Sequence, residues 1–317
     1  MSEIQSFGRI YYLYVESPTG EELDLGEGFF AVDNALTEIT ENRITASVNF
    51  SAVSTTAKAN SARITIFNLA EETIQLFRTK GVKVTLKAGY RTENADNELK
   101  DLPIIIRGEV TKTKISNNNV DKILELTITP LATERKTAII SKKFPQGTLL
   151  TEAIKQVCEP MIVGSNLTID FNVGKSKENF ILGRTKTFSA SPFEALDEIL
   201  NEHGLTGNFE NEILRLRNKG TPTLVTSEII EIDPTRIKGS LDLSTDFSKS
   251  EEGEGEGVEV DFTTFLDTRI HLNSNIQLTV NGSSGTYIVN SIGYRLDTHS
   301  NAWDVMVNAS SISSSDT

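Results

Sequence analysis

The chain has 317 residues, and 38% of them are hydrophobic. A chain of this length usually folds around more than one hydrophobic core, so we expect two or three domains. Its 44 acidic and 31 basic side chains give a net charge of −13, which argues against a protein that holds nucleic acid along a basic track. A single cysteine, Cys158, excludes a disulfide framework and a thiolate metal site.

No signal-peptide pattern stands at the N-terminus, and no run approaches the roughly 20 apolar residues of a membrane span. We therefore expect a chain that is made in the cytosol and does not insert into a membrane.

The first part of the chain alternates with the period of two that is typical of half-buried strands. In ITASVNF, residues Ile44, Ala46, Val48 and Phe50 share one face. The segment VKVTLKAGY, residues 82–90, alternates in the same way. The pattern predicts a β sheet or barrel with its apolar face turned to a core.

A short helix is predicted between two of these strands. Asn68 follows the strand ARITIFNL as a candidate N-cap, and Glu71 stands three residues further on. Gly81 is expected to end the helix.

The middle of the chain changes to the period of amphipathic helices. Thr148 opens one helix, whose apolar stripe contains Cys158, so we expect this thiol in a core. A second helix has Ser191 as N-cap, Pro192 at its first position and Gly204 past its end.

The last part of the chain is predicted as β structure again, with one interruption. The segment SEEGEGEG, residues 250–257, alternates Glu and Gly and cannot bury apolar area, which favours a solvated surface loop. A cation site in this loop is the alternative, although the spacing is not that of an EF-hand.

An internal repeat links the two β regions. The first region reads GVKVTLKAGY, then PIIIRGEVTKTK, then KILELTITPLA, and the second reads SNIQLTVNG, then GTYIVNSIGYRL, then AWDVMVNASSI. Each is a strand, a strand with a nearby glycine, a polar turn and a closing strand. Antiparallel meanders resemble one another in general, so coincidence stays open as the alternative to two related domains.

No catalytic constellation is recognised in the sequence. His203, His271 and His299 are far apart, and the GxSxG, HExxH, P-loop and GxGxxG motifs are absent. Asp297 and His299 lie within LDTHSN, whose residues favour a turn between two strands. We predict no enzyme activity, no metal and no cofactor.

Three segments, in order, resemble baseplate hub proteins of contractile phage tails and phage-like injection particles, of the late control protein D type. They are ANSARITIFNLAEETIQLFRTKGVKVTLKAGY with IIIRGEVTKTK, then FSASPFEALDEILNEHGLTGNFENEILRLRNKG, then GTYIVNSIGYRLDTHSNAWDVMVNA. The first resembles the N-terminal domain of such hubs, the second their middle segment and the third their closing hairpin.

The resemblance implies a mainly β fold with some α structure. It implies two tube-type β-barrel or sandwich domains, at 1–140 and 221–317, joined by a small α+β region at 141–220. Such hubs are homotrimers, and two similar domains per chain give a ring of pseudo-sixfold symmetry that adapts a threefold spike to a sixfold tail tube. The expected partners are the spike, the tail tube protein, and the baseplate wedge and tape-measure proteins.

The resemblance also implies a place in the virion tail baseplate, assembled in the host cytoplasm. DNA is expected to pass through the ring without specific binding. No lysozyme-like or needle-shaped extension accompanies the match, so wall-cutting activity is not implied.

Polar strand faces are the candidate lining of the channel. The residues are Thr85, Lys87, Glu125, Thr127, Thr129, Gln277, Thr279 and Asn308. Their apolar neighbours, Leu124, Leu126, Ile128, Ile276, Leu278 and Val280, are expected to face the cores. The alternative is that the polar residues face solvent on the outer wall. Trp303 is predicted to plug a barrel or anchor an interface.

Two other function classes stay open. A tail-associated peptidoglycan hydrolase would need a cleft with positioned acids, and nothing in the sequence selects a pair of them. A carbohydrate-binding β module would need exposed aromatic side chains, and only 7% of the residues are aromatic.

Overall fold

The structure is a computed structural model. It describes residues 8–20, 22–30, 44–51, 60–91, 102–118, 120–162, 167–172, 179–218, 229–246, 257–280 and 283–311. Most of the Glu-Gly segment, residues 250–256, lies outside this described part, and so does the question of a solvated loop or a cation site.

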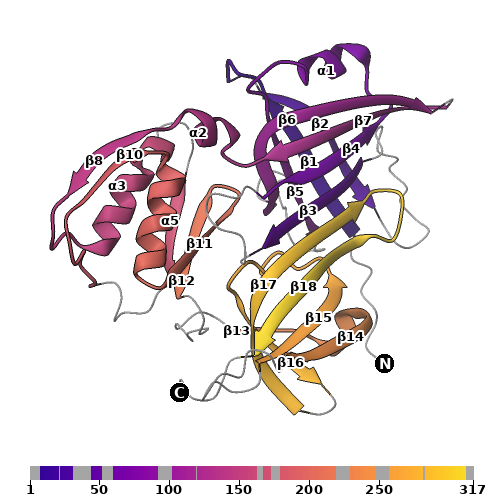
Figure 1. Ribbon diagram of the computed structural model, residues 1–317. Helices are drawn as coiled ribbons and strands as arrows, with labels where there is room; N and C mark the ends of the chain where they lie inside the picture. The colour runs from indigo at the N-terminus through magenta and orange to yellow at the C-terminus, as the bar shows by residue number, and fades with distance from the viewer. Residues whose placement is uncertain are drawn as a thin grey trace.

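A sheet of thirteen strands dominates the fold (Figure 1). Its strands are β1 (Gly8–Glu16), β2 (Glu22–Phe30), β3 (Ile44–Ser51), β4 (Ala62–Phe67), β5 (Lys83–Arg91), β6 (Ile104–Asn118), β7 (Asp121–Thr129), β13 (Ile229–Glu231), β14 (Ile237–Asp246), β15 (Gly257–Phe265), β16 (Asn275–Val280), β17 (Ser283–Asp297) and β18 (Trp303–Ser311). The order is β14-β15-β18-β17-β3-β4-β7-β6-β5-β1-β2, and β16 pairs with both β17 and β13. Every pair is antiparallel except β13 with β16.

Alternation along the strands builds the core. Ile44, Ala46 and Val48 of β3 are buried as predicted, and so are Val84 and Leu86 of β5. The predicted core positions of later strands are buried as well: Leu124, Leu126, Ile128, Ile276 and Leu278. One continuous hydrophobic cluster contains the buried residues of both β regions. The mainly β fold with some helix is confirmed.

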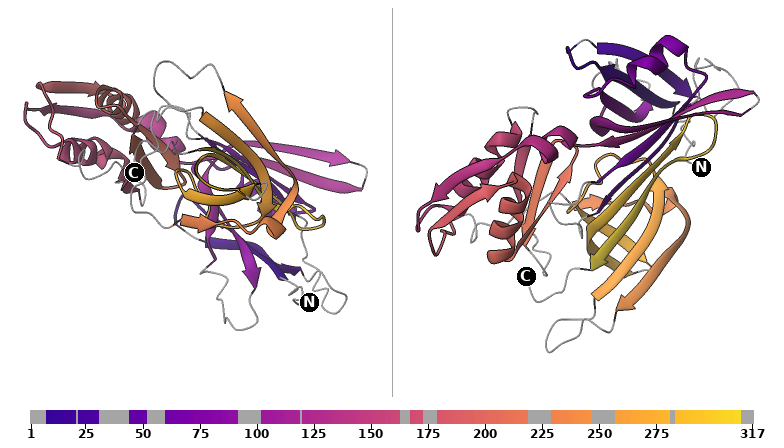
Figure 2. Two further views of the ribbon diagram at one scale, coloured as in Figure 1. Left: turned by 90° about the horizontal axis from the view of Figure 1, so that it is seen from below. Right: turned by 45° about the horizontal axis from the view of Figure 1, so that its top comes forward.

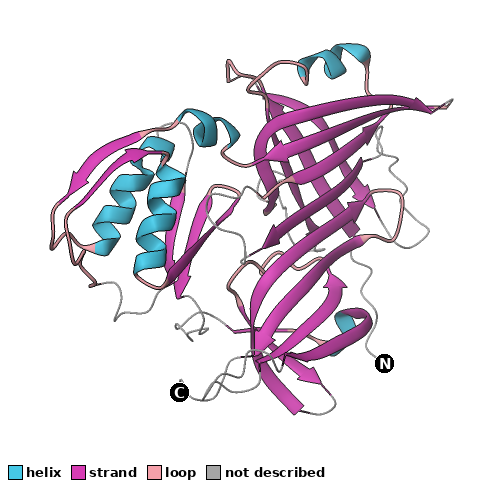
Figure 3. Ribbon diagram, viewed as in Figure 1, coloured by secondary structure: helices cyan, strands magenta, loops and turns pink. Residues whose placement is uncertain are grey.

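The middle region has a core of its own and lies to one side of the large sheet (Figures 1 and 2). Its elements are α2 (Ala132–Thr137), β8 (Ile140–Phe144), α3 (Leu150–Ile162), β9 (Thr168–Asn172), β10 (Lys186–Ala190), α5 (Pro192–Glu202), β11 (Leu205–Glu210) and β12 (Ile213–Asn218). Strands β11, β12 and β9 form one small sheet, and β10 pairs with β8. The two long helices, α3 and α5, lie side by side here (Figure 3).

Of the two predicted helix N-caps, Ser191 is confirmed and Asn68 is wrong. Ser191 caps α5 by accepting a hydrogen bond from the backbone N–H of Phe193, as predicted, and Gly204 follows with a φ of 62°. Helix α1 (Glu71–Leu76) begins after Ala70, so Asn68 is not its cap. Asn68 adopts a φ of 60°, and its side chain bonds Asp121 and the backbone N–H of Lys122 instead.

The internal repeat is confirmed in the order of the strands. Strands β3 to β7 pair in the order β3-β4-β7-β6-β5, and strands β14 to β18 pair in the order β14-β15-β18-β17-β16. The long strands β6 and β17 each have 15 residues. Both are shifted in register against the following strand at their eighth residue, Thr111 in β6 and Asn290 in β17. A shared bulge at one position is a specific feature of two related units.

The two repeats join directly. The second half of β17, Ser291–Asp297, pairs with residues 51–45 of β3 in the first repeat. The β regions therefore share one sheet, and the middle region branches from it instead of standing between them (Figure 1).

Gly108 of β6 tests this packing. A methyl group at Gly108 would lie 2.7 Å from the carbonyl carbon of Thr129. This is a backbone atom, so the clash could be relieved only by a shift of the main chain. We expect Gly108→Ala to destabilise the fold by about 1–3 kcal/mol, measured by the urea midpoint. Gly183→Ala is the matched control, because nothing lies within 4 Å of its added methyl group. Equal midpoints for the two variants would contradict the close approach of β6 to the end of β7.

Candidate functional site: the polar face of the sheet

One face of the large sheet is polar across both repeats. Residues opposite each other in neighbouring strands point to the same face. A single row of such neighbours crosses β18, β17, β3, β4, β7 and β6. Its members are Asp304, Arg295, Ser47, Arg63, Thr127 and Lys112. The polar face is therefore a continuous surface that spans the junction between the repeats.

Two arginines of this row, Arg295 and Arg63, are paired with acids. The Arg295 guanidinium donates to Asp304 at 3.0 Å, and Lys238 contacts the same carboxylate, which is 2% exposed. Arg63 lies 3.6 Å from Glu125. The exposed pair of Arg63 and Glu125 contributes little to stability, but both sets of pairs leave less free positive charge for a phosphate backbone.

The structure brings several of the predicted channel residues onto the polar face. Glu125, Thr127 and Thr129 are half-buried, opposite the buried side of β7. Asn308 occupies the equivalent strand, β18, and donates to Asp261 at 2.9 Å. Lys87 and Gln277 are half-buried, and Thr279 is exposed. Val280, predicted for the core, lies outside the described side chains.

Thr85 differs from the rest of this set, because it is only 2% exposed. It lies between Tyr14 and Arg107 in the sheet. The turn between β11 and β12 covers this part of the face: Asn211 accepts from the backbone N–H of Arg107 at 2.9 Å, and Glu212 lies 3.3 Å from its guanidinium. Thr85 is therefore buried beside Arg107, the residue that the middle region contacts.

Trp303 lies at the contact between the two repeats. Its side chain is 1% exposed, and its Nε1–H donates to the carbonyl of Gly89 in β5 at 3.2 Å. Tyr90 donates back to the Trp303 carbonyl at 3.4 Å. Burial raises the pKa of the Tyr90 hydroxyl to about 12, so it stays protonated and able to donate. The anchoring contacts of Trp303 are within the chain.

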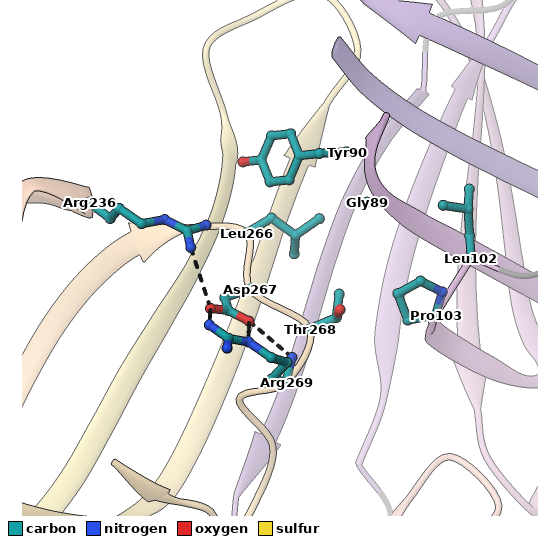
Figure 4. Close-up of a pocket in the computed structure, with 9 residues that line it drawn as sticks. All are labelled: Gly89, Tyr90, Leu102, Pro103, Arg236, Leu266, Asp267, Thr268 and Arg269. Atoms are coloured by element: carbon teal, nitrogen blue, oxygen red, sulfur yellow. Dashed lines mark hydrogen bonds and ion pairs between the residues drawn. The ribbon is translucent and has the colours of Figure 1, made fainter. Parts of the chain in front are cut away.

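A cleft of about 390 Å³ opens beside this contact (Figure 4). Its lining is Gly89, Tyr90, Leu102, Pro103, Arg236, Leu266, Asp267, Thr268 and Arg269. Burial opposes ionisation of Asp267, but hydrogen bonds from Arg269, at 2.7 and 3.0 Å, outweigh it and lower the pKa of the carboxyl. Arg236 approaches the same group at 3.7 Å. The acid is thus held ionised in an ion pair, which favours a structural role.

The segment LDTHSN forms a turn, as predicted. Asp297 accepts a hydrogen bond from the backbone N–H of His299 at 2.8 Å, a typical arrangement for such turns. Thr298, which the sequence reasoning passed over, is buried. Its hydroxyl accepts from the N–H of Ile44 at 2.9 Å and donates to the Ile44 carbonyl at 3.2 Å. The turn therefore fastens the β17–β18 hairpin to the start of β3.

The groups that could carry chemistry are dispersed. His203 caps the end of α5 and contacts the Ile199 carbonyl, while His271 contacts Ser274 and His299 lies at the exposed turn. Within the described residues, no group of three or more His, Cys, Asp or Glu side chains could hold a metal ion. In the same part of the chain, no helix combines the length and the apolar character that crossing a membrane requires.

The fold is that of phage tail proteins. The 43 kDa tail protein of prophage MuSo2 from Shewanella oneidensis is 11% identical, with a TM-score of 0.57 over 95% of this chain and 98% of that chain. The tail protein from Neisseria meningitidis MC58 is 10% identical, with a TM-score of 0.58 over 95% and 96%. The E. coli c3393 protein, a component of the type VI secretion system, is 9% identical, with a TM-score of 0.57 over 88% and 77%.

Residues 30–309 match the family described as baseplate hub gp41, and the chain belongs to this family. It is a structural protein of the virion tail baseplate, as the resemblance predicted. No curated protein sequence matches the chain.

Replacement of Trp303 tests the contact between the repeats. Trp303→Phe keeps an aromatic ring but removes the pyrrole part of the indole, and with it the donor to the buried Gly89 carbonyl, so we expect a loss of about 1–3 kcal/mol in the free energy of unfolding. Met306→Leu, on the same strand but on the opposite and exposed face, is the control and should change it by less than about 0.5 kcal/mol. Unchanged stability of the Phe variant in urea titrations would refute the anchoring role.

Cys158 gives a probe of the middle region. It is fully buried in α3, and burial raises the pKa of its thiol to about 12. Since the thiolate is the reactive form, we expect the native protein at pH 8 to react with an aromatic disulfide reagent about 100-fold more slowly than the urea-unfolded chain. Full labelling of the native protein at the unfolded rate would mean that the core of the middle region opens readily.

Proposed function

We propose that this chain forms a homotrimeric ring that adapts a threefold spike to the sixfold tail tube and leaves a channel for DNA or other cargo. The observation that carries the proposal is the repeat of five strands in one pairing order, with equivalent bulges in β6 and β17. Two similar units per chain give three chains six similar positions around one axis.

The channel wall in this proposal is the polar face of the sheet. Its candidate residues are Lys87, Glu125, Thr127, Thr129, Gln277, Thr279 and Asn308. Equivalent strands supply several of them, since Thr127 of β7 and Asn308 of β18 both lie opposite the first residue after the bulge. Pairing of Arg63 and Arg295 with acids supports passage of DNA without specific binding. Images that placed this face on the outer wall would exclude the channel role.

The proposed role is assembly without catalysis. The ring would bind the spike on one side and the tail tube protein on the other, with baseplate wedge and tape-measure proteins as further partners. Assembly would take place in the host cytoplasm, without insertion into a membrane. Membership in a family of baseplate hubs supports these partners as a class.

The mass of the purified protein in solution tests the ring. We expect light scattering at several concentrations to give three times the mass of the chain or, after addition of the spike protein, the mass of a complex that contains three copies of the chain. Microscopy of the trimer should then show a ring with a central hole. A monomer at every concentration, both with and without the spike, would overturn the proposal.

A further inference from the structure

One edge of the long strand β6 is only half covered. Its first half, Ile104–Glu109, pairs with β5, and the backbone N–H of Val110 still reaches the Val82 carbonyl. From Lys112 to Asn118, the strand paired with β6 in the described part of the chain is β7, on its other edge, and the Thr113 hydroxyl also donates to the Phe77 carbonyl at 3.2 Å. The two strands run together to a tip that projects from the rest of the sheet (Figures 1 and 2).

The equivalent half of β17 is covered on both edges. Its first half pairs with β16, as that of β6 pairs with β5. Its second half, Ser291–Asp297, pairs with β18 on one edge and with β3 on the other. Within the described residues, the second half of β6 therefore has no counterpart of strand β3 beside it.

The counterpart of β3 in the second repeat is β14. In the first repeat, β3 pairs with β4, and β4 pairs with the closing strand β7. In the second repeat, β14 pairs with β15, and β15 pairs with the closing strand β18. Strand β14 is one end strand of the sheet, with β15 as its partner, and β2 is the other end of the strand order. In the described part of the chain, the second half of β6 and strand β14 therefore each have a strand partner on one edge alone, at different places in the sheet.

Resting on the proposed trimer, we propose that residues 112–118 of β6 in one copy pair antiparallel with β14 of the next copy. The contact repeats between chains the pairing of β17 with β3 within the chain. An uncovered strand edge presents unpaired N–H and C=O groups that another strand satisfies. The occupant of this edge is a second copy of the same chain.

The repeat also fixes the register. Tyr294 lies four residues after the bulge in β17 and is opposite Val48 in β3. In β6 the residue four places after the bulge is Ile115. In β14 the residue equivalent to Val48 is Leu243, because Leu243 connects through Val260 and Ala309 to the last residue before the bulge, Val289. The junction therefore places Leu243 opposite Ile115.

Exposure of these residues fits a missing neighbour. Val48 is 0% exposed, whereas its counterpart Leu243 is 47% exposed. Tyr294 is 4% exposed, whereas its counterpart Ile115 is only partly buried. Apolar side chains on the core side of a sheet lose contact with water when the adjacent strand is in place. The proposed junction brings both residues under cover.

Charge along the two edges is complementary. Lys112 and Lys114 are exposed on the free half of β6, and Asp242 is exposed on β14. The register that sets Leu243 against Ile115 sets Asp242 against Ser116, diagonal to Lys114. Long side chains reach across such a diagonal in antiparallel pairs.

The junction is head-to-tail, since it joins different strands of the two copies. Head-to-tail contacts form rings when the rotation closes. Three such junctions alternate with the three internal contacts of β17 with β3, which gives six equivalent sheet contacts around the ring.

Disulfide trapping tests the register. In the full chain carrying both Ile115→Cys and Leu243→Cys, we expect mild oxidation to link the copies into covalent trimers on a denaturing gel without reductant. Each single variant should give no covalent trimer, since the native Cys158 is buried. The matched control pairs Leu243→Cys with Lys114→Cys. Neighbouring residues of a strand point to opposite faces, so we expect at least a tenfold loss of covalent product.

Charge exchange is the second measurement. We expect Lys114→Glu to shift the mass in solution from three chains toward one, and addition of Asp242→Lys to restore the trimer. Unchanged circular dichroism of each variant would show that the monomer is folded.

The outcomes separate the two proposals. A trimer by light scattering in which the Ile115 and Leu243 cysteines form no link, or link no better than the shifted control, would overturn the strand pairing and leave the ring in place. A chain that stays monomeric with and without the spike, and gives no covalent product, would overturn both. Covalent trimers restricted to the predicted register would support the junction.

Discussion

The backbone pairing between β17 and β3 is the contact on which the rest of the molecule depends. It joins the second repeat to the first through seven residue pairs, Ser291 to Asp297 against residues 51 to 45. Because of it, buried residues of both repeats form a single hydrophobic cluster, and the polar face continues from β18 to β6. Thr298 closes the same junction at one end through its two hydrogen bonds to Ile44, and Trp303 with Gly89 fills the space beside it.

Duplication accounts for both the likeness and the difference of the two halves. Their strands pair in one order and bulge at one position, so the backbone geometry recurs. The neighbours do not recur: β17 has β3 beside it, while the corresponding half of β6 does not have such a strand within the described chain. In the proposed ring, the internal contact of β17 with β3 is the template for the contact between copies.

The middle region has a different role in this arrangement. Its helices α3 and α5 pack on their own sheet and their own core, so it folds around a separate hydrophobic cluster. It meets the large sheet through polar contacts: Asn211 and Glu212 at Arg107, Asn60 at the Phe209 carbonyl, and Thr133 at Glu109. These contacts cover one end of the polar face and leave the row from Arg295 to Lys112 at least partly exposed, while Asp304 at its end is buried under its two basic partners. The placement of this region thus decides which part of the sheet is available to partners.

Much of the local structure was determined by the sequence alone. Alternation placed Val48 and Leu126 in the core, Ser191 and Pro192 marked the start of α5, and the recurring strand pattern predicted the duplication, because these signals act between residues close in the chain. Tertiary structure decided the rest. The Asn68 side chain accepts a hydrogen bond from the backbone N–H of Lys122 instead of capping a helix. Thr85 is buried beside Arg107, whose backbone N–H donates to Asn211 of the middle region. The Trp303 indole donates to the carbonyl of Gly89, 214 positions away. Every strand presents the same backbone groups at its edges, so the pairing of β17 with β3 could not be predicted from the local sequence pattern. The packing of the complete fold determines which strands pair.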